Sequence, residues 1–268
     1  MTYTEPEIFN RSRLLLGDKG MTVLEHANVI IFGIGGVGSW AAETLVRTGL
    51  KHLTIVDADR VAVSNINRQA PATTLTVGEE KVEAMRRRLL EINPAAEITA
   101  RCEIYTADTA GDFDLEQYDY VIDAIDSLAD KALLMLNATL ARRPKLYSSM
   151  GAALKLDPTR IRVAEFREVK GCRLAAALRR RFKKLGRYPS KKIACVFSDE
   201  LLPNLGIPDN TSESAASDAP MTFNKVATNG SLCHITAIFG LTLAGLLLKH
   251  LTAKASCGCN MTRQDTPA

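Results

Sequence analysis

The stretch VIIFGIGGVGSWAAETLVRTGLKHLTIVDAD, residues 29–59, decides the fold of this chain. An apolar run leads into four glycines, a helical segment follows, and a second apolar run ends on two acids. This order predicts a strand, a helix and a second strand, the unit that holds a nucleotide phosphate at its first turn. The glycines are Gly33, Gly35, Gly36 and Gly38. The motif itself leaves open a tight glycine turn without a ligand.

Each residue type in this unit has a physical reason to be there. Gly33 and Gly35 allow a sharp turn that brings backbone N–H groups to a phosphate, and Gly38 lets the helix pack closely on the strand. The phosphate then lies at the positive end of the helix dipole. Asp57 follows Gly38 by 19 residues and is placed to accept hydrogen bonds from ribose hydroxyls, with Asp59 just beyond it. These features do not distinguish a dinucleotide from ATP.

The composition indicates an ordinary globular protein. At 268 residues, the chain is long enough for one large α/β domain or for one domain with a substantial insertion. The N-terminal residues MTYTEPEIFNR are polar, so we expect no export signal. Six cysteines are scattered apart from Cys257 and Cys259, which favours free thiols in a reducing cytoplasm. A structural zinc site typically has two CxxC pairs, whereas Cys257 and Cys259 form a lone CxC, so we expect a terminal tail there, with metal binding as the alternative.

Strand and helix patterns alternate down to about residue 155, which predicts a Rossmann-like, doubly wound and mostly parallel sheet. Helices are expected at residues 19–25, 78–92 and 127–143, the last capped by Ser127, and further strands at 97–105, 118–126 and 145–154. Later elements are strands at 159–166 and 192–200, a mobile polar loop at 203–220 and an apolar helix at 231–251. We therefore divide the chain into a nucleotide-binding domain, residues 1–155, and a C-terminal extension, residues 156–268, packed on the same core.

The apolar run in the last helix, residues 235–248, is 14 residues long. A transmembrane helix needs about 20 apolar residues. We therefore expect a helix buried against the sheet or at a dimer interface, and no membrane span.

A basic block occupies residues 170–192, with ten Lys or Arg residues and no Asp or Glu. A solvated helix face is one interpretation of such a run. The density of charge favours the other, a polyanionic partner such as a nucleic acid.

Further polar residues follow the predicted parallel strands, at the edge where ligands of doubly wound sheets bind. Arg68 lies in the loop SNINRQ and can donate to a phosphate oxygen. Lys81 opens the next helix, where an ammonium can stabilise a leaving pyrophosphate. Asp126, at the end of the predicted fourth strand, can hold Mg²⁺. Together they predict a cationic, metal-binding rim that suits a triphosphate and that a dehydrogenase does not need.

Four motifs in order resemble the superfamily of ubiquitin-activating and related adenylating enzymes. They are GIGGVGSWAAETLVRTG (33–49), VDADRVAVSNINRQ (56–69), GEEKVEAM (78–85) and VIDAIDS (121–127). With CVFSDE (195–200) and TAIFG (236–240), nearly the whole chain resembles the bacterial tRNA threonylcarbamoyladenosine dehydratases. The resemblance implies a homodimer that uses ATP to activate the carboxylate of threonylcarbamoyladenosine in tRNA, so that the side chain closes to a cyclic form.

The resemblance also implies roles for individual residues. The glycine turn, Gly33 to Gly38, would bind ATP, Asp57 and Asp59 would lie at the ribose, Asn65, Arg68 and Lys81 at the phosphates, and Asp126 at Mg²⁺. Arg11 matches an arginine that the superfamily inserts from the partner subunit, with Arg13 as the alternative. Cys195 matches a family cysteine, and its apolar surroundings favour a buried structural thiol. A sulfur-relay partner, such as a cysteine desulfurase, is left open.

Three other functions are weighed against this one. An adenylyltransferase for a ubiquitin-like sulfur carrier explains the nucleotide motifs but does not need the basic block. A non-catalytic, nucleotide-dependent nucleic-acid-binding module does not need Lys81 or Asp126. A NAD-dependent oxidoreductase leaves both the SNINRQ loop and the Mg²⁺ carboxylate unexplained.

Overall fold

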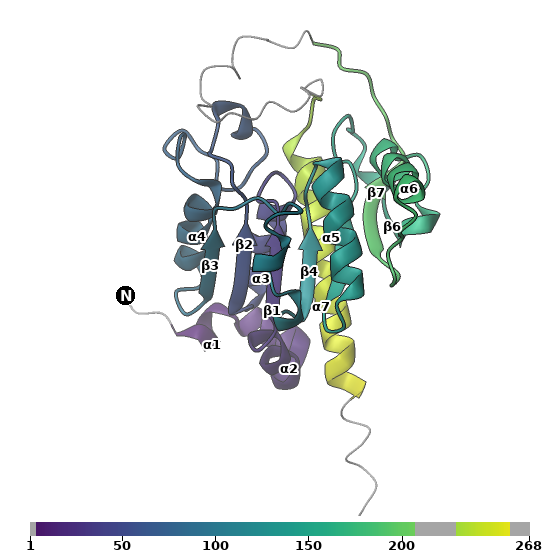
Figure 1. Cartoon of the computed structure of the whole chain (residues 1–268). Helices are drawn as coiled ribbons and strands as arrows, with labels where there is room; N and C mark the ends of the chain where they lie inside the picture. Colours follow the sequence, from purple (N-terminus) through teal and green to yellow (C-terminus); the bar gives the residue numbers. More distant parts are fainter. Residues whose placement is uncertain (1–3, 207–228, 258–268) are drawn as a thin grey trace, which may run out of the picture.

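The stretch at 29–59 forms β1 (Asn28–Phe32), α3 (Gly38–Thr48) and β2 (His52–Val56), as its pattern predicts. β1 and β2 are parallel, with Val29 opposite Leu53. Four of the five residues in each strand are buried, as expected of strands covered on both faces. This unit is the centre of a computed structural model that describes residues 4–206 and 229–257 (Figure 1).

The sheet has seven strands in the order β3-β2-β1-β4-β5-β7-β6. The remaining strands are β3 (Glu97–Arg101), β4 (Tyr120–Asp123), β5 (Lys145–Ser149), β6 (Ile161–Glu165) and β7 (Ala194–Ser198). Every neighbouring pair is parallel except β6 and β7, which are antiparallel at one edge. The prediction of a doubly wound, mostly parallel α/β sheet is confirmed.

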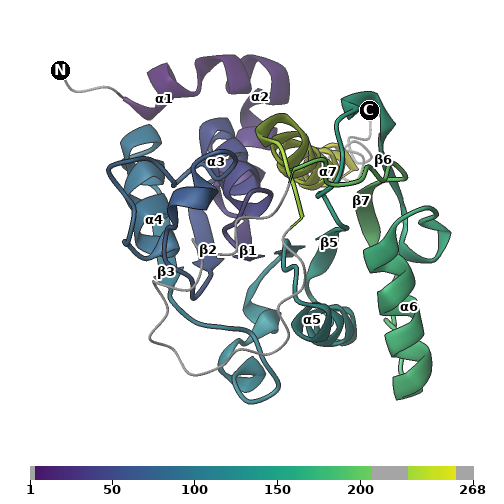
Figure 2. The same ribbon diagram turned by 90° about the horizontal axis from the view of Figure 1, so that it is seen from above.

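Helices cover both faces of the sheet (Figure 2). One face carries α3, α4 (Lys81–Ile92) and α7 (Cys233–Cys257), whose apolar residues share one buried cluster with β1 and β2. The other face carries α5 (Leu128–Leu140) and α6 (Arg173–Leu185), which form the second cluster. The chain leaves β1 toward α3 and leaves β4 toward α5, on opposite faces. Neighbouring strands that diverge in this way open a crevice at their carboxyl ends.

Short elements complete the chain. α1 (Glu5–Ile8) and α2 (Asn10–Glu25) lie below the amino ends of the strands in Figure 1. Single 3₁₀ turns occupy Val63–Asn65, Ala110–Asp112, Leu115–Gln117, Pro158–Arg160 and Phe166–Glu168. The sheet runs across residue 155, while the division of the chain at that residue stays a prediction. Most of the loop expected at 203–220, and Cys259 of the CxC pair, lie outside the described residues.

Several predicted boundaries were wrong. The N-terminal helix spans Asn10–Glu25, not 19–25, and contains a break at Gly17, which has φ 68°. The fourth strand ends at Asp123 instead of residue 126, because the Asp123 carboxylate turns back to accept the Ile125 N–H at 3.1 Å. Ser127 occupies the N-cap position of α5 without a side-chain capping bond.

Helix α7 is, among the described helices, the one long and apolar enough to cross a membrane by length and composition. It packs on α2, α3 and β5. Ile235, Phe239, Leu243 and Leu247 recur on its buried side, which is the spacing of one helix face. Their burial against α3 and the sheet is the arrangement expected of a core helix.

The contact between α7 and α3 depends on a glycine. A Cβ added to Gly240 would lie 2.3 Å from the Val37 carbonyl oxygen and 2.9 Å from the Ala41 nitrogen. Only a residue without a side chain lets α7 approach the first turn of α3 so closely. Because α3 begins at the glycine turn, α7 supports that turn from behind.

We predict that Gly240→Ala lowers the free energy of unfolding by about 1–3 kcal/mol, the usual range for overpacking. Gly245→Ala is the matched control, because Gly245 lies on the exposed side of the same helix with nothing within 4 Å of an added Cβ. It should stabilise the protein by roughly 0.5–1 kcal/mol, since alanine favours the helix. Urea unfolding measures both; equal stability of the two variants would mean that the helices do not meet at Gly240.

Candidate functional site

The glycine turn is shaped by two close approaches of the backbone. Gly33 has φ 88°, and a Cβ there would lie 2.7 Å from the Ala124 carbonyl oxygen at the end of β4. A Cβ on Gly38 would lie 1.8 Å from the Gly33 carbonyl oxygen. The N–H groups of Gly35 and Gly36 donate no hydrogen bond to a described residue. The turn therefore presents unsatisfied donors at the start of α3, as an anion site requires.

A cavity of about 800 Å³ opens beside this turn, at the carboxyl ends of β1, β2, β4 and β5. Its lining includes eight of the predicted site residues: Gly33, Gly35, Gly36, Asp57, Asp59, Arg68, Lys81 and Asp126. Gly38, Asn65 and Arg11 do not line it. The structure thus brings most of the predicted residues together, while their individual roles stay predictions.

Asp57 connects the second strand to the glycine turn. One carboxylate oxygen accepts the Ile34 N–H at 2.6 Å, and the other accepts the Asp59 N–H at 2.9 Å. Burial raises the pKa of Asp57, although Lys81 and these two N–H groups oppose the shift. The carboxylate therefore holds the turn in place before any ligand arrives, and its remaining lone pairs face the cavity.

Lys81 is buried and held by the neighbouring acids. Its Nζ lies 2.7 Å from Asp59 and 4.0 Å from Asp57. Asp59 is itself exposed, so the ammonium is anchored between the buried end of β2 and the open cavity. A phosphate placed there would share this cation with Asp59.

The loop after β2 carries Asn65 and Arg68. The Asn65 side chain is buried and accepts the Ala62 N–H at 3.1 Å, which fixes the turn of the loop. Arg68 donates to the Ser64 carbonyl and to Asn67, both at 2.8 Å. Arg68 therefore lines the cavity from a braced position, and Asn65 lies behind it.

Two carboxylates at the start of α5 have no partner within the part of the chain that the structure describes. Asp126 and Asp130 both line the cavity, and neither makes a hydrogen bond or ion pair with a described residue. Open carboxylates beside a phosphate site are the donors that a hard divalent cation prefers. Within the described residues no group of three or more His, Cys, Asp or Glu side chains is placed to hold a metal by itself, so Asp126 and Asp130 are the candidates for binding a cation together with a ligand.

The prediction of a cationic rim was wrong. Five acids face two bases in the lining: Asp57, Asp59, Glu103, Asp126 and Asp130 against Arg68 and Lys81. The motifs single out the bases because they stand in recognisable patterns, whereas Glu103 and Asp130 lie outside them. An acid-rich cavity can hold a polyanion only with additional positive charge.

Other lining residues were missed altogether. The carboxyl-edge rule could have found residues 103–105 after β3 and 149–153 after β5, since both segments follow parallel strands. Leu174 and Thr236 had no such signal, because they come from α6 and α7, whose packing no local pattern predicts. Gln69 stands in the SNINRQ loop; it is 7% exposed and its Oε1 has no partner among the described residues.

Arg11 and Arg13 lie on α2, away from the cavity. Arg13 is bound within the chain, at 2.6 Å from Asp18 and 3.9 Å from Glu25. Arg11 is exposed and has no polar partner among the described residues. Leu14 and Leu15 beside it are 80% and 85% exposed. Of the two arginines, Arg11 is the one available to another molecule.

The basic block forms α6 and its flanks. Within the described residues none of its ten cations forms an ion pair with a carboxylate. Arg179 turns inward and donates to the Val169 carbonyl at 2.9 Å. Arg180, Lys183 and Lys184 are exposed. Leu174 in its first turn lines the cavity, so α6 begins at the cavity and its exposed cations follow on the later turns.

Cys195 is fully buried on β7, and burial raises the pKa of its thiol. A protonated, inaccessible thiol is a poor nucleophile. This agrees with the structural role expected for Cys195.

Comparisons with known proteins agree with this geometry. The profile of the ThiF family matches residues 9–265. The tRNA threonylcarbamoyladenosine dehydratase of Escherichia coli (strain K12) is 36% identical over 257 residues, 92% of this chain and 94% of that protein. The enzyme of the same name from Bacillus subtilis (strain 168) is 41% identical over 192 residues, 72% of this chain and 74% of that protein.

The crystal structure of the E. coli enzyme, TcdA, in complex with ATP superimposes with a TM-score of 0.81 at 33% identity, covering 96% of this chain and 99% of that one. The adenylyltransferase and sulfurtransferase MOCS3 of Drosophila willistoni is 34% identical over 158 residues, which are 58% of this chain and 34% of that protein.

Proposed function

The chain belongs to the ThiF family, and on this premise we propose that it is an ATP-dependent tRNA threonylcarbamoyladenosine dehydratase. The observation that carries the proposal is the nearly full-length likeness to an E. coli enzyme of that name crystallised with ATP. The alternative, activation of a sulfur-carrier protein, is not favoured, because the relative with that function matches only part of this chain.

The reaction is an adenylation followed by ring closure. The carboxylate of the threonylcarbamoyl group displaces pyrophosphate from ATP, and the resulting mixed anhydride has a good leaving group. A nucleophile of the same modified base then closes the ring and releases AMP. The net change in the nucleoside is the loss of one water.

The residues of this chain have separate tasks in that reaction. The free N–H groups of Gly35 and Gly36 bind phosphate oxygens, and Asp57 accepts hydrogen bonds from the ribose. Arg68 and Lys81 stabilise the charge of the departing pyrophosphate. Asn65 holds the loop on which Arg68 stands. Asp59 holds the Lys81 ammonium beside the cavity, at 2.7 Å from its Nζ.

Two carboxylates of the cavity lining are the candidates for holding Mg²⁺. Asp126 would hold it, with Asp130 next to it on α5. When bound, the ion neutralises charge on the phosphates. The cavity lining contains five acids, and ATP would bring further negative charge into it. This excess of negative charge supports the need for a divalent cation in the complex.

A second copy of the chain would supply another cation. Arg11 belongs to α2, which lies below the amino ends of the strands in Figure 1, whereas the residues that line the cavity follow the carboxyl ends of the strands. Arg11 cannot serve its own cavity from there. In a homodimer, Arg11 of one protomer would enter the cavity of its partner, with exposed Leu14 and Leu15 at the contact.

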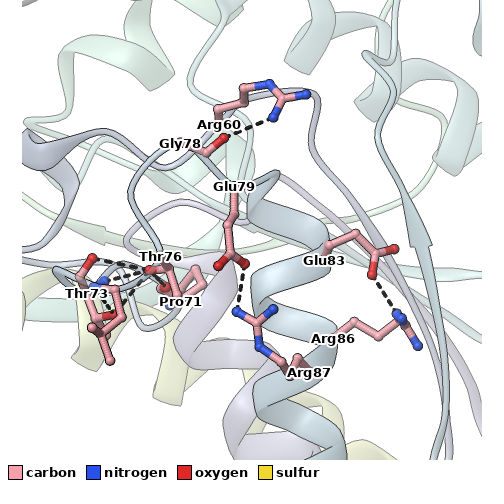
Figure 3. A network of polar contacts seen from close by, with 10 residues as sticks. Arg60, Pro71, Thr73, Thr76, Gly78, Glu79, Glu83, Arg86 and Arg87 are labelled. Atoms are coloured by element: carbon pink, nitrogen blue, oxygen red, sulfur yellow. Dashed lines mark hydrogen bonds and ion pairs between the residues drawn. The ribbon is translucent and has the colours of Figure 1, made fainter.

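The tRNA would lie along α6. Among the described residues, no acid forms an ion pair with the exposed cations Arg180, Lys183 and Lys184. On α4, by contrast, Arg86 and Arg87 pair with Glu83 and Glu79 (Figure 3). Unpaired cations release counterions when they meet phosphates, and paired ones gain less. We further propose a cytoplasmic location, where tRNA and ATP are found, and no membrane span; a sulfur-relay partner stays a prediction.

The first test is the product. Purified protein with Mg·ATP should convert tRNA that carries threonylcarbamoyladenosine into a nucleoside lighter by one water, as measured by mass spectrometry of the digest. Asp126→Ala should slow this conversion at least about hundredfold, because it removes charge stabilisation from the site. Asp108→Ala, an exposed aspartate outside the cavity, is the control. An unchanged nucleoside mass in the wild type would refute the activity, and full activity of Asp126→Ala would refute the metal role.

Complementation between inactive variants tests the shared site. Arg11→Ala and Asp126→Ala should each be inactive alone. Co-expressed in equal amounts, half of the dimers are mixed and each has one intact site, so about a quarter of wild-type activity should return. The control pair replaces Arg11→Ala by Arg13→Ala, which should already be active alone because Arg13 is committed to Asp18. No recovery in the first pair would contradict the placement of Arg11 in the partner's cavity.

Salt dependence tests the α6 surface. The triple variant Arg180→Gln, Lys183→Gln and Lys184→Gln should bind tRNA more weakly. The slope of the logarithm of its binding constant against the logarithm of salt concentration should be smaller by about one for each lost phosphate contact. Arg60→Gln, Arg86→Gln and Arg87→Gln together form the control, which removes the same charge from positions that pair with Glu80, Glu83 and Glu79. Equal slopes for the two triple variants would mean that α6 is a solvated helix face that does not contact tRNA phosphates.

A further inference from the structure

A salt bridge is fully buried beneath the cavity. Lys131 Nζ lies 2.8 Å from Asp123 Oδ2, and both side chains are 0% exposed. Neither residue lines the cavity. Asp123 ends β4 and Lys131 lies in the second turn of α5, so the pair joins the strand to the helix across the intervening loop.

The pair holds both polar groups of one peptide residue in that loop. The Ile125 N–H donates to Asp123 Oδ1 at 3.1 Å, and the Ile125 carbonyl accepts from Lys131 Nζ at 3.1 Å. Ser148, opposite Asp123 on β5, donates its hydroxyl to Asp123 Oδ2 at 2.7 Å. Rotation of the peptide at Ile125 would therefore break bonds to both buried charges.

The loop held in this way forms part of the cavity wall. Ala124, Ile125 and Asp126 all line the cavity. The Ala124 N–H donates to the Phe32 carbonyl at 2.8 Å, next to Gly33, and the Ala124 carbonyl occupies the space that a Gly33 side chain would need. A movement at Ile125 would thus shift both the glycine turn and Asp126.

Stability alone does not account for the pair. A buried ion pair loses hydration, and apolar residues of similar volume are often as stabilising or more so. Lys131 also lies near the amino end of α5, where the helix dipole disfavours a cation. What the pair contributes is the orientation of the loop, because Asp123 and Lys131 each form a hydrogen bond with the backbone of Ile125.

We propose that Asp123, Lys131 and Ser148 are positioning residues that orient residues 124–126, so that Asp126 and the glycine turn are set for Mg·ATP before it binds. The inference rests on the proposed ATP-binding function. The three residues touch neither ATP nor the metal; they act through the backbone of Ile125.

The decisive variant removes both charges at once. Asp123→Asn with Lys131→Met leaves no unpaired buried charge and should keep the fold, as replacements of buried ion pairs often do. Lys155→Met is the matched control, because Lys155 is also buried and its Nζ donates to the Glu200 carbonyl at 2.6 Å, away from the 124–126 loop. Ser148→Ala is a milder variant, which removes a single hydrogen bond from Asp123.

Two readouts separate positioning from mere stability. Hydrogen exchange of the Ile125 amide should become faster in the double variant without ligand, while the strands stay protected. Calorimetry should show that the gain in ATP affinity on adding Mg²⁺ falls at least about tenfold, since small misplacements of charged groups are costly. Ser148→Ala should change both quantities in the same direction but less. Lys155→Met should leave both at wild-type values.

The inference is overturned if a folded double variant keeps both the wild-type exchange rate at Ile125 and the wild-type response to Mg²⁺. If that variant does not fold, the same two measurements on Ser148→Ala decide, and wild-type values there overturn it. A wild-type protein that binds no ATP would refute the proposed function instead, while the exchange rate at Ile125 would still report on the loop.

Discussion

Two backbones touch where β1 and β4 end, and the rest of the structure depends on that contact. The strands are neighbours, but their helices leave toward opposite faces of the sheet. The cavity exists because the chains diverge there, and its wall is continuous because Gly33 carries no side chain toward Ala124. Asp57 ties the glycine turn to β2 from one side, and the Asp123–Lys131 pair ties the neighbouring loop to α5 from the other. The site is rigid because both of its halves are anchored in the core.

The local part of this arrangement could be predicted from the sequence. Glycine spacing, apolar runs and the acid at position 57 are short-range patterns with a single physical solution, and they gave the central unit and the doubly wound sheet. The order of β6 and β7 could not be predicted, because the pairing of distant strands leaves no local mark. Lys131 illustrates the same limit. In the sequence it is an ordinary helix residue, and only its burial against Asp123 distinguishes it.

The charge of the site follows a similar logic. Motifs identify Arg68 and Lys81, yet the cavity as a whole is acidic because carboxylates from three further segments converge on it. In the proposed complex the missing positive charge comes from outside the fold, as Mg²⁺ and as Arg11 of the partner. In this proposal, the cavity of a single subunit lacks the positive charge that is needed to balance ATP. This arrangement would make nucleotide binding depend on assembly, while the free cations of α6 attract the second polyanion at a separate surface.

The place of α7 in the chain has a consequence for biosynthesis. This helix follows every strand in the sequence, yet it covers the central face of the sheet and backs the glycine turn through Gly240. While the ribosome is still making residues 233–257, the apolar surface of α3 and β5 has no cover. This apolar surface of the nascent sheet is therefore expected to stay exposed until nearly all of the described chain has been synthesised. Completion of the cavity wall is thus expected late in synthesis, because Thr236 of this helix lines the cavity.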